Sequence, residues 1–119
     1  MRTDASGTGL GAVLLQEKDG KKFPIAYASR KLSSAEKRYA ITELECLAIV
    51  WAINKFQKYL YGREFVLETD HQALSFMNQA KLTNSRVMRW ALTLQPFKFH
   101  VQVLPGKENI GADFLSRVC

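Results

Sequence analysis

Four acidic residues occupy positions where a carboxylate could take part in chemistry: Asp4, Glu45, Asp70 and Asp113. Asp4 and Asp70 each end a short strand-like run, and ligands of α/β sheets gather at such strand ends. Glu45 belongs to a helical pattern, and Asp113 lies about one turn inside a final helix that Asn109 can cap. Taken singly, each acid could instead be a helix cap, a turn residue or a surface charge.

The chemistry that such a set would perform depends on divalent metal. Clustered carboxylates repel one another, and they repel a phosphodiester even more strongly, so a chain that gathers them needs cations between them. Oxygen ligands suit Mg²⁺ or Mn²⁺. Two Mg²⁺ ions about 4 Å apart can activate a water and stabilise the leaving oxygen on opposite sides of one phosphorus. The four acids together therefore predict metal-assisted phosphodiester hydrolysis.

Two glutamates compete for the helical position in this set. At about 100° per residue, Glu45 shares a helix face with apolar residues such as Ala48, whereas Glu43 points with Asn54 toward solvent. A carboxylate on the packed side needs a cation or several donors to offset its desolvation. Alternatively, Glu45 only completes a capping box begun by Thr42. Both interpretations of Glu45 fit the pattern, and the seven acids outside the set of four are assigned to turns or polar faces.

The spacing of apolar residues along the chain predicts the strands and helices that must position the acids. A strand ending at Ala5 precedes a hairpin of two extended runs, 10–16 and 23–29, joined by an Asp-Gly turn. Gly7, Gly9 and Gly11 lead into a strand, which argues against a dinucleotide-binding fingerprint. The segments that follow are a helical turn from 33, a helix over 42–61, a strand over 65–69, a weak helix over 71–77, a helix with a buried stripe over 87–94, and a strand over 97–103. This order predicts an α/β domain with a five-stranded mixed sheet, half antiparallel hairpin and half parallel crossovers.

Length and composition limit the class of protein. The 119 residues, 47% of them hydrophobic, suit one domain over 1–119. The excess of 17 Lys and Arg over 11 Asp and Glu gives a net charge of +6, which fits a nucleic-acid partner or merely a soluble surface. No run suits a membrane span or a signal peptide. Cys46 and Cys119 cannot form a disulfide framework or a zinc site, so reduced thiols and an intracellular location are expected.

Motifs throughout the chain occur in the order and approximate spacing of a known family. They are Thr3-Asp4-Ala5-Ser6, Gly9–Leu14, Pro24–Leu32, Glu43–Val50, Tyr59–Gly62, Thr69-Asp70-His71, Arg89-Trp90, Pro105-Gly106-Lys107 and Ala112–Arg117. Together they resemble the ribonuclease H domain of gypsy-type long-terminal-repeat retrotransposon reverse transcriptases. The resemblance covers essentially the whole chain.

The resemblance implies a ribonuclease H-like fold and cleavage of the RNA strand of an RNA:DNA hybrid. It places metal ligands at Asp4, Glu45, Asp70 and Asp113, with two Mg²⁺ ions for which Mn²⁺ could substitute. By this analogy Asp4 bridges both ions, Glu45 and Asp70 complete the coordination, and Asp113 holds the ion beside the attacking water. The implied partners are the hybrid and the polymerase part of a reverse transcriptase.

The chain departs from the family's pattern in two places. Val103 stands where many members carry a histidine or tyrosine about ten residues before the final aspartate. Only three residues precede Asp4, so the first strand is expected to be shortened at its amino end. His71 and His100 are interpreted as a helix-start residue and a surface residue.

Nucleic-acid contacts are less specific in the sequence. Ser6 and Gly7, in the turn after Asp4, are candidates for the RNA strand. Arg86 and Arg89 are candidates for the DNA strand, unless they are only solvated flanks of the 87–94 stripe. Two rival functions stay open: a catalytically silent domain of the same fold that binds or tethers nucleic acid, and a related enzyme that acts on DNA.

Overall fold

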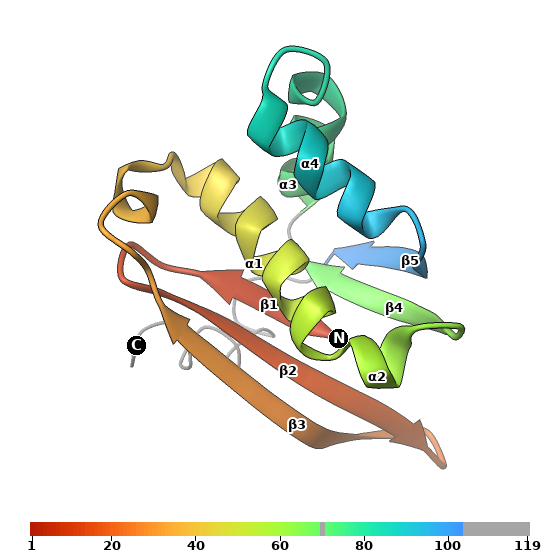
Figure 1. The fold of residues 1–119 in the computed structure, drawn as a ribbon. Helices are drawn as coiled ribbons and strands as arrows, with labels where there is room; N and C mark the ends of the chain where they lie inside the picture. The colour runs from red at the N-terminus through yellow and green to blue at the C-terminus, as the bar shows by residue number, and fades with distance from the viewer. Residues whose placement is uncertain (70, 104–119) are drawn as a thin grey trace.

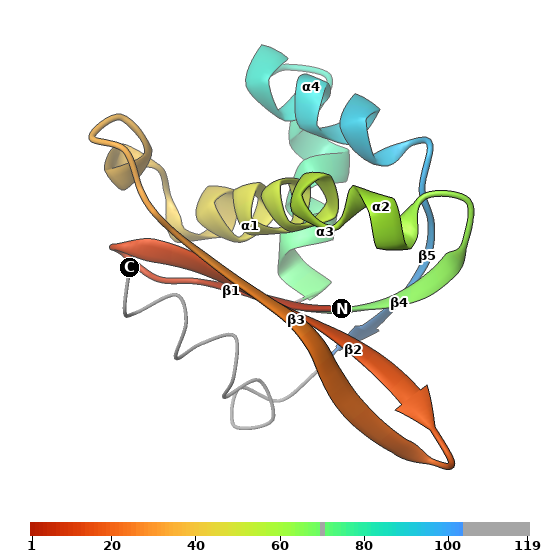
Figure 2. The same cartoon turned by 60° about the horizontal axis from the view of Figure 1, so that its bottom comes forward.

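The computed structural model describes residues 1–69 and 71–103, which form a five-stranded sheet with helices on one face (Figures 1 and 2). The strands are β1 (Arg2–Ala5), β2 (Gly9–Lys18), β3 (Lys21–Lys31), β4 (Glu64–Thr69) and β5 (Lys98–Val103). The helices are α1 (Ile41–Lys55), α2 (Gln57–Leu60), α3 (His71–Ala80) and α4 (Ser85–Leu94), and a 3₁₀ turn spans Glu36–Arg38. The sheet order is β3-β2-β1-β4-β5.

The pairing of the strands confirms the predicted mixed sheet. β1, β2 and β3 are antiparallel neighbours, whereas β4 runs parallel to both β1 and β5. The hairpin has longer strands than its apolar runs suggested, because Lys18 pairs with Lys21 directly beside the turn. Asp19 and Gly20 form this two-residue turn with φ of 55° and 77°, the backbone that matches strand twist in hairpins.

The core lies between the sheet and α1. Seven of the fifteen residues of α1 are buried and only three are exposed, so little of this helix faces solvent. The largest fully buried side chains are Leu10, Cys46, Ile49, Ile53, Leu67 and Val87. Strand alternation sorts β1 into two faces. Ala5 packs against α1, and Thr3 pairs with Ala12, which also lies in the core. Arg2 and Asp4 therefore stand on the face turned away from α1.

The long helix differs from the prediction at both ends. It begins at Ile41 with Ala40 as its N-cap and with no side-chain cap hydrogen bond, so the capping-box interpretation of Glu45 is wrong. It ends at Lys55, because the C-cap residue Phe56 leaves the helical region with φ of −102° and ψ of 20°, and the four-residue α2 follows. Phe56 and Leu60 are both buried, so the chain reorients to keep both side chains in the core.

The elements near the carboxyl end follow the predicted pattern as far as they are described. The side chain of Asn84 caps α4 by accepting hydrogen bonds from the amides of Arg86 at 3.0 Å and Val87 at 3.2 Å. β5 exposes Lys98, His100 and Gln102, as its alternation predicted, but Val101 on the other face is also 40% exposed. The predicted final helix, which includes Asn109 and Asp113, lies outside the described residues. Among the described helices, none combines the length and apolarity that crossing a bilayer requires.

Candidate active site

Asp4 lies near the carboxyl end of β1. It is half-buried and sits opposite Gly11 of β2 in the antiparallel register, so its strand partner there has no side chain. The carboxylate belongs to the sheet face turned away from α1, because Thr3 and Ala5 on either side of it face the helix. Asp4 therefore occupies the strand-end position that the sequence predicted.

The turn after β1 holds the two predicted RNA contacts. The Ser6 amide donates to the Gly9 carbonyl at 2.9 Å, and the Ser6 hydroxyl accepts from the amides of Thr8 at 3.3 Å and Gly9 at 3.2 Å. Gly7 is exposed, and a Cβ at that position would meet no other atom within 4 Å. Ser6 thus organises the turn, and Gly7 leaves its tip open to a ligand.

Glu45 lies in the amino-terminal half of α1 and is half-buried. Its neighbours Leu44 and Ala48 pack in one cluster with Ala5 of β1. Because Ala5 follows Asp4 and Leu44 precedes Glu45, the two acids come from segments in direct contact at one end of the sheet. The predicted helix face of Glu45 is confirmed, since Ala48, like other residues on that face, is buried.

The ends of β1 and β4 meet at this edge of the sheet. The Thr3 hydroxyl donates to the Thr69 hydroxyl at 3.4 Å, and both residues are buried. Thr69 is the last residue of β4, and Asp70 follows it in the sequence. Asp70 and Asp113 lie outside the described residues, so the structure places two of the four predicted acids. Within the described part of the chain, no group of three His, Cys, Asp or Glu side chains gathers closely enough to hold a metal ion.

Glu43 is not the solvated residue that the helix phase predicted. The Arg86 guanidinium of α4 donates to its carboxylate, and only 19% of the Glu43 side chain is exposed. The same guanidinium lies over the Tyr39 ring, 4.1 Å from its centroid, and 5.6 Å from the Trp90 centroid. The prediction failed because α4 packs along this flank of α1, which a single-helix projection cannot show. Arg86 is thus engaged inside the fold, whereas Arg89 is exposed.

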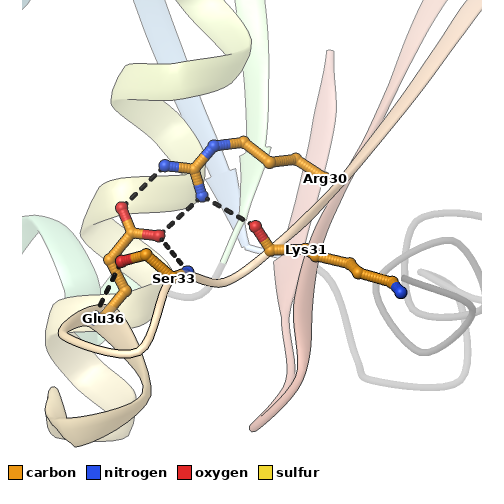
Figure 3. A network of polar contacts seen from close by, with 4 residues as sticks. All are labelled: Arg30, Lys31, Ser33 and Glu36. Carbon is orange, nitrogen blue, oxygen red and sulfur yellow. Dashed lines mark hydrogen bonds and ion pairs between the residues drawn. The ribbon is translucent and has the colours of Figure 1, made fainter.

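A second ion pair fixes the connection that leads into α1 (Figure 3). Arg30 of β3 donates to both carboxylate oxygens of Glu36, at 2.8 and 2.6 Å, and to the Lys31 carbonyl at 3.2 Å. Glu36 also accepts from the Ser33 amide at 2.8 Å, while the Ser33 hydroxyl accepts from the Glu36 amide at 3.2 Å. This reciprocal pair is a capping box, and it confirms the helical turn predicted from 33.

The same network explains the acidity of Glu36. The hydrogen bonds from Arg30 lower the pKa of Glu36 to about 2, against the opposing effect of burial. The carboxylate therefore stays ionised, and the ion pair persists at neutral pH. Glu36 lies between β3 and α1 in the chain, so the network fastens the start of this connection to the end of β3.

Glu68 is a buried acid that the sequence interpretation missed. It is 2% exposed and forms ion pairs with Arg2 of β1 and, at 2.5 Å, with Lys22 of β3. Burial alone would raise the pKa of Glu68, but the hydrogen bonds from Lys22 and Arg2 lower it below its ordinary value. The available signal was its place between Leu67 and Thr69 in a strand that the sequence predicts to be paired on both sides, where side chains are often buried. Arg2 and Glu68 stand on the same sheet face as Asp4.

Solved structures define the class of fold. RNase H1 from the halophilic archaeon Halobacterium salinarum NRC-1 superposes with a TM-score of 0.71 at 20% identity, covering 96% of this chain and 90% of that one. LC11-RNase H1, solved in complex with an RNA/DNA hybrid, gives a TM-score of 0.61 at 18% identity with the same coverage of both chains. The fold is ribonuclease H-like, as predicted.

Sequence comparison identifies the family within that fold. The family described as "RNase H-like domain found in reverse transcriptase" matches residues 1–97, and the chain belongs to it. The chain is 48% identical over 118 residues to the retrovirus-related Pol polyprotein from transposon gypsy of Drosophila melanogaster, covering 98% of the chain and 11% of the polyprotein. It is 42% identical over 116 residues to the polyprotein from transposon 412 of the same organism, covering 98% of the chain and 9% of that polyprotein. The chain thus spans about a tenth of the length of these relatives.

Proposed function

We propose that this domain is a metal-dependent endonuclease that hydrolyses the RNA strand of RNA:DNA hybrids as one part of a reverse transcriptase polyprotein. The observation that carries the proposal is the contact between the end of β1 and the amino-terminal half of α1, which brings the segments of Asp4 and Glu45 together. The neighbouring acid, Glu43, is neutralised by Arg86. Membership in a family of RNase H-like domains supports a nuclease over other classes of enzyme.

Asp4, Glu45, Asp70 and Asp113 would hold two Mg²⁺ ions, with Mn²⁺ as a substitute. The donor chemistry of the two described acids fits, because both are carboxylates, the ligands that Mg²⁺ prefers, and both are only half-buried. Bound ions of this kind supply an activated water and stabilise the leaving oxygen. The backbone of Asp4 belongs to the strand ladder and that of Glu45 to a helix packed on the sheet, so in this proposal the two acids start from rigid elements.

The hybrid would bind along the exposed turn after β1 and the basic surface of the domain. Ser6 and Gly7 are proposed to contact the RNA strand, where 2′-hydroxyl groups distinguish RNA from DNA. The net charge of +6 favours the phosphate backbone. Arg89 is the exposed candidate for the DNA strand, whereas Arg86 would act through Glu43 on the position of α1. The polymerase part of a longer polyprotein is the proposed covalent partner.

The test offers the chain three end-labelled substrates: RNA:DNA hybrid, double-stranded RNA and double-stranded DNA, each with Mg²⁺ and with chelator. We expect cleavage of the hybrid alone, only in its RNA strand and only with Mg²⁺. Comparable cleavage of double-stranded DNA would contradict the assignment. Hybrid binding without cleavage under any metal condition would instead identify a silent nucleic-acid-binding domain.

A further inference from the structure

β5 is the last strand on its side of the sheet (Figures 1 and 2). In the part of the chain that the structure describes, it pairs only with β4, and the two strands are parallel. A strand with one partner presents a row of backbone N–H and C=O groups along its other edge. β5 is therefore a place where a further strand could join the sheet.

Hydrogen bonds on the far side of β4 indicate which groups of β5 face outward. The Met1 amino nitrogen donates to the Val66 carbonyl, and the Glu68 amide donates to the Met1 carbonyl, each at 2.7 Å. Val66 and Glu68 thus direct their backbone groups toward β1, and the residue between them directs its own toward β5. That residue lies opposite Val101, so Val101 and Phe99 turn their N–H and C=O groups to the outer edge.

A pocket of about 600 Å³ lies beside this edge, between α3, α4 and β5. We call it the edge pocket. Its apolar lining includes Leu74 and Met77 of α3, Leu94 of α4 and Phe99 of β5. Val101, the next residue of β5 on the same sheet face as Phe99, is 40% exposed. The helices thus leave the core-side face of this edge strand incompletely covered, and a further strand could place apolar side chains there.

The charged residues around the edge pocket favour an acidic partner. Lys81 and Lys98 line it, and Oε2 of Glu64, an acid in the lining, lies 3.6 Å from Nε2 of His100. Lys98 and His100 stand on the opposite face of β5 from Phe99, and both are exposed. Acidic side chains on one face of an added strand would therefore meet these residues, while apolar ones on its other face enter the pocket.

We propose that the β5 edge and the edge pocket form a docking site for an extended peptide segment of a partner protein, in which acidic and apolar residues alternate. Such a segment would join the sheet beside β5. A second copy of this chain fits less well, because its own β5 would bring the same Lys98 and His100, and like charges destabilise a strand pair. A nucleic acid could pair with the lysines but could not continue the backbone ladder. The proposal does not depend on nuclease activity.

The test uses two end-blocked, fluorescently labelled peptides of the same composition. The first, Glu-Leu-Glu-Phe-Glu-Val-Glu, alternates, whereas the control, Glu-Glu-Leu-Phe-Val-Glu-Glu, has the same charge without the alternation. We expect the alternating peptide to bind at least about tenfold more tightly in fluorescence anisotropy, because only it can place every acid on one face. At saturation it should also slow hydrogen exchange of the Phe99 and Val101 amides at least about tenfold.

Two matched variants locate the site on the protein. Val101→Glu places an acid on the face where the apolar side chains of the peptide would lie, so we expect binding at least about tenfold weaker. Val66→Glu is the control, because Val66 is 42% exposed but lies opposite His100 on the other sheet face. Its affinity should stay within about twofold of the wild type. Melting curves check that both variants are folded, and the peptide pair decides the question if Val101→Glu is not.

No binding of the alternating peptide at about 1 mM would overturn the proposal, as would equal affinity for the two peptides. Protection of the Phe99 and Val101 amides that grows with protein concentration in the absence of peptide would overturn it in favour of a second copy. Protection by a single-stranded oligonucleotide instead of the peptide would identify nucleic acid as the occupant. None of these measurements uses metal or hybrid, so failure here leaves the nuclease assignment to its own test.

Discussion

The hydroxyl of Thr3 donates to the hydroxyl of Thr69 across the β1–β4 interface, between residues that are 66 positions apart in the sequence. Each threonine is buried, and each directly precedes an acid that we propose as a metal ligand. The contact joins the carboxyl ends of the parallel strands β1 and β4, so that these two ends lie side by side. It therefore links β1 to β4 directly beside the two acids that we propose as ligands.

Removing this contact should destabilise the domain in a non-additive way. Thr3→Val leaves the buried Thr69 hydroxyl without this partner, so we expect a loss of about 1 kcal/mol, and a similar loss for Thr69→Val. The double variant should cost less than the sum of the two, because it removes both polar groups. Urea denaturation of the four proteins measures the coupling. Strictly additive losses would show that the hydroxyls do not interact.

Glu45→Gln should remove most hydrolysis of the hybrid while the domain stays folded. The change replaces a proposed metal-binding carboxylate by a neutral amide. In metal enzymes, changing a residue that only hydrogen-bonds a metal ligand already lowers metal affinity or activity about 10–100-fold. Glu17→Gln is the matched control, since Glu17 is exposed in the hairpin. Initial rates of RNA-strand cleavage, together with melting curves, separate lost activity from lost fold. Equal rates for the two variants would contradict the role of Glu45.

Glu43→Gln should reduce stability more than activity. The carboxylate is paired with Arg86, which also stacks on Tyr39, so the change leaves a half-buried guanidinium without its counter-charge. For a partly exposed pair we expect a loss of about 1 kcal/mol. Arg86→Lys keeps the charge but loses the planar stack, and it should also destabilise. Chemical denaturation measures the stability of both variants. Wild-type stability for both would show that the Glu43–Arg86 pair and the Arg86–Tyr39 stack do not stabilise the domain.

The Arg30–Glu36 pair predicts a specific loss of stability in acid. The folded-state pKa of Glu36, about 2, lies below its ordinary value of 4.5, so the folded state binds fewer protons than the unfolded state. The contribution of Glu36 is fully present above about pH 5 and is lost as pH falls toward 2. We expect about 1 kcal/mol, because Arg30 is partly screened by solvent.

Glu36→Gln is the comparison for this titration. The variant should be less stable than the wild type at pH 7, and the two unfolding free energies should converge near pH 2. Denaturation at a series of pH values measures both curves, and the titration of Glu68 is common to the two proteins. A constant difference across the whole range would mean that Glu36 does not titrate with a lowered pKa.

The sequence alone predicted the sheet, the hairpin and the place of Asp4 because these depend on local periodicity. The alternation of 65–69 and the turn at Asp19-Gly20 are short-range signals, and the structure follows them. The helix face of Glu45 was also predictable, since helical phase is fixed by geometry.

What the sequence could not supply depends on contacts between distant elements. The partner of Glu43 lies 43 residues away on α4, and the partners of Glu68 lie on β1 and β3. The break at Phe56 arises from core packing, because no glycine or proline marks it. To predict any of these features, one must know which elements contact each other in the fold. The periodicity of apolar residues in the sequence does not contain that information.

The two-residue turn at Asp19-Gly20 has a consequence for the order in which the domain assembles. A hairpin with such a turn can form within about 1–10 μs, since its pairs are close in the chain. The β1–β4 pairing must first close a loop of more than sixty residues, which is slow because loop closure costs entropy before contacts compensate for it. The hairpin half should therefore fold first and serve as the template, and the β1–β4 pairing should be completed last.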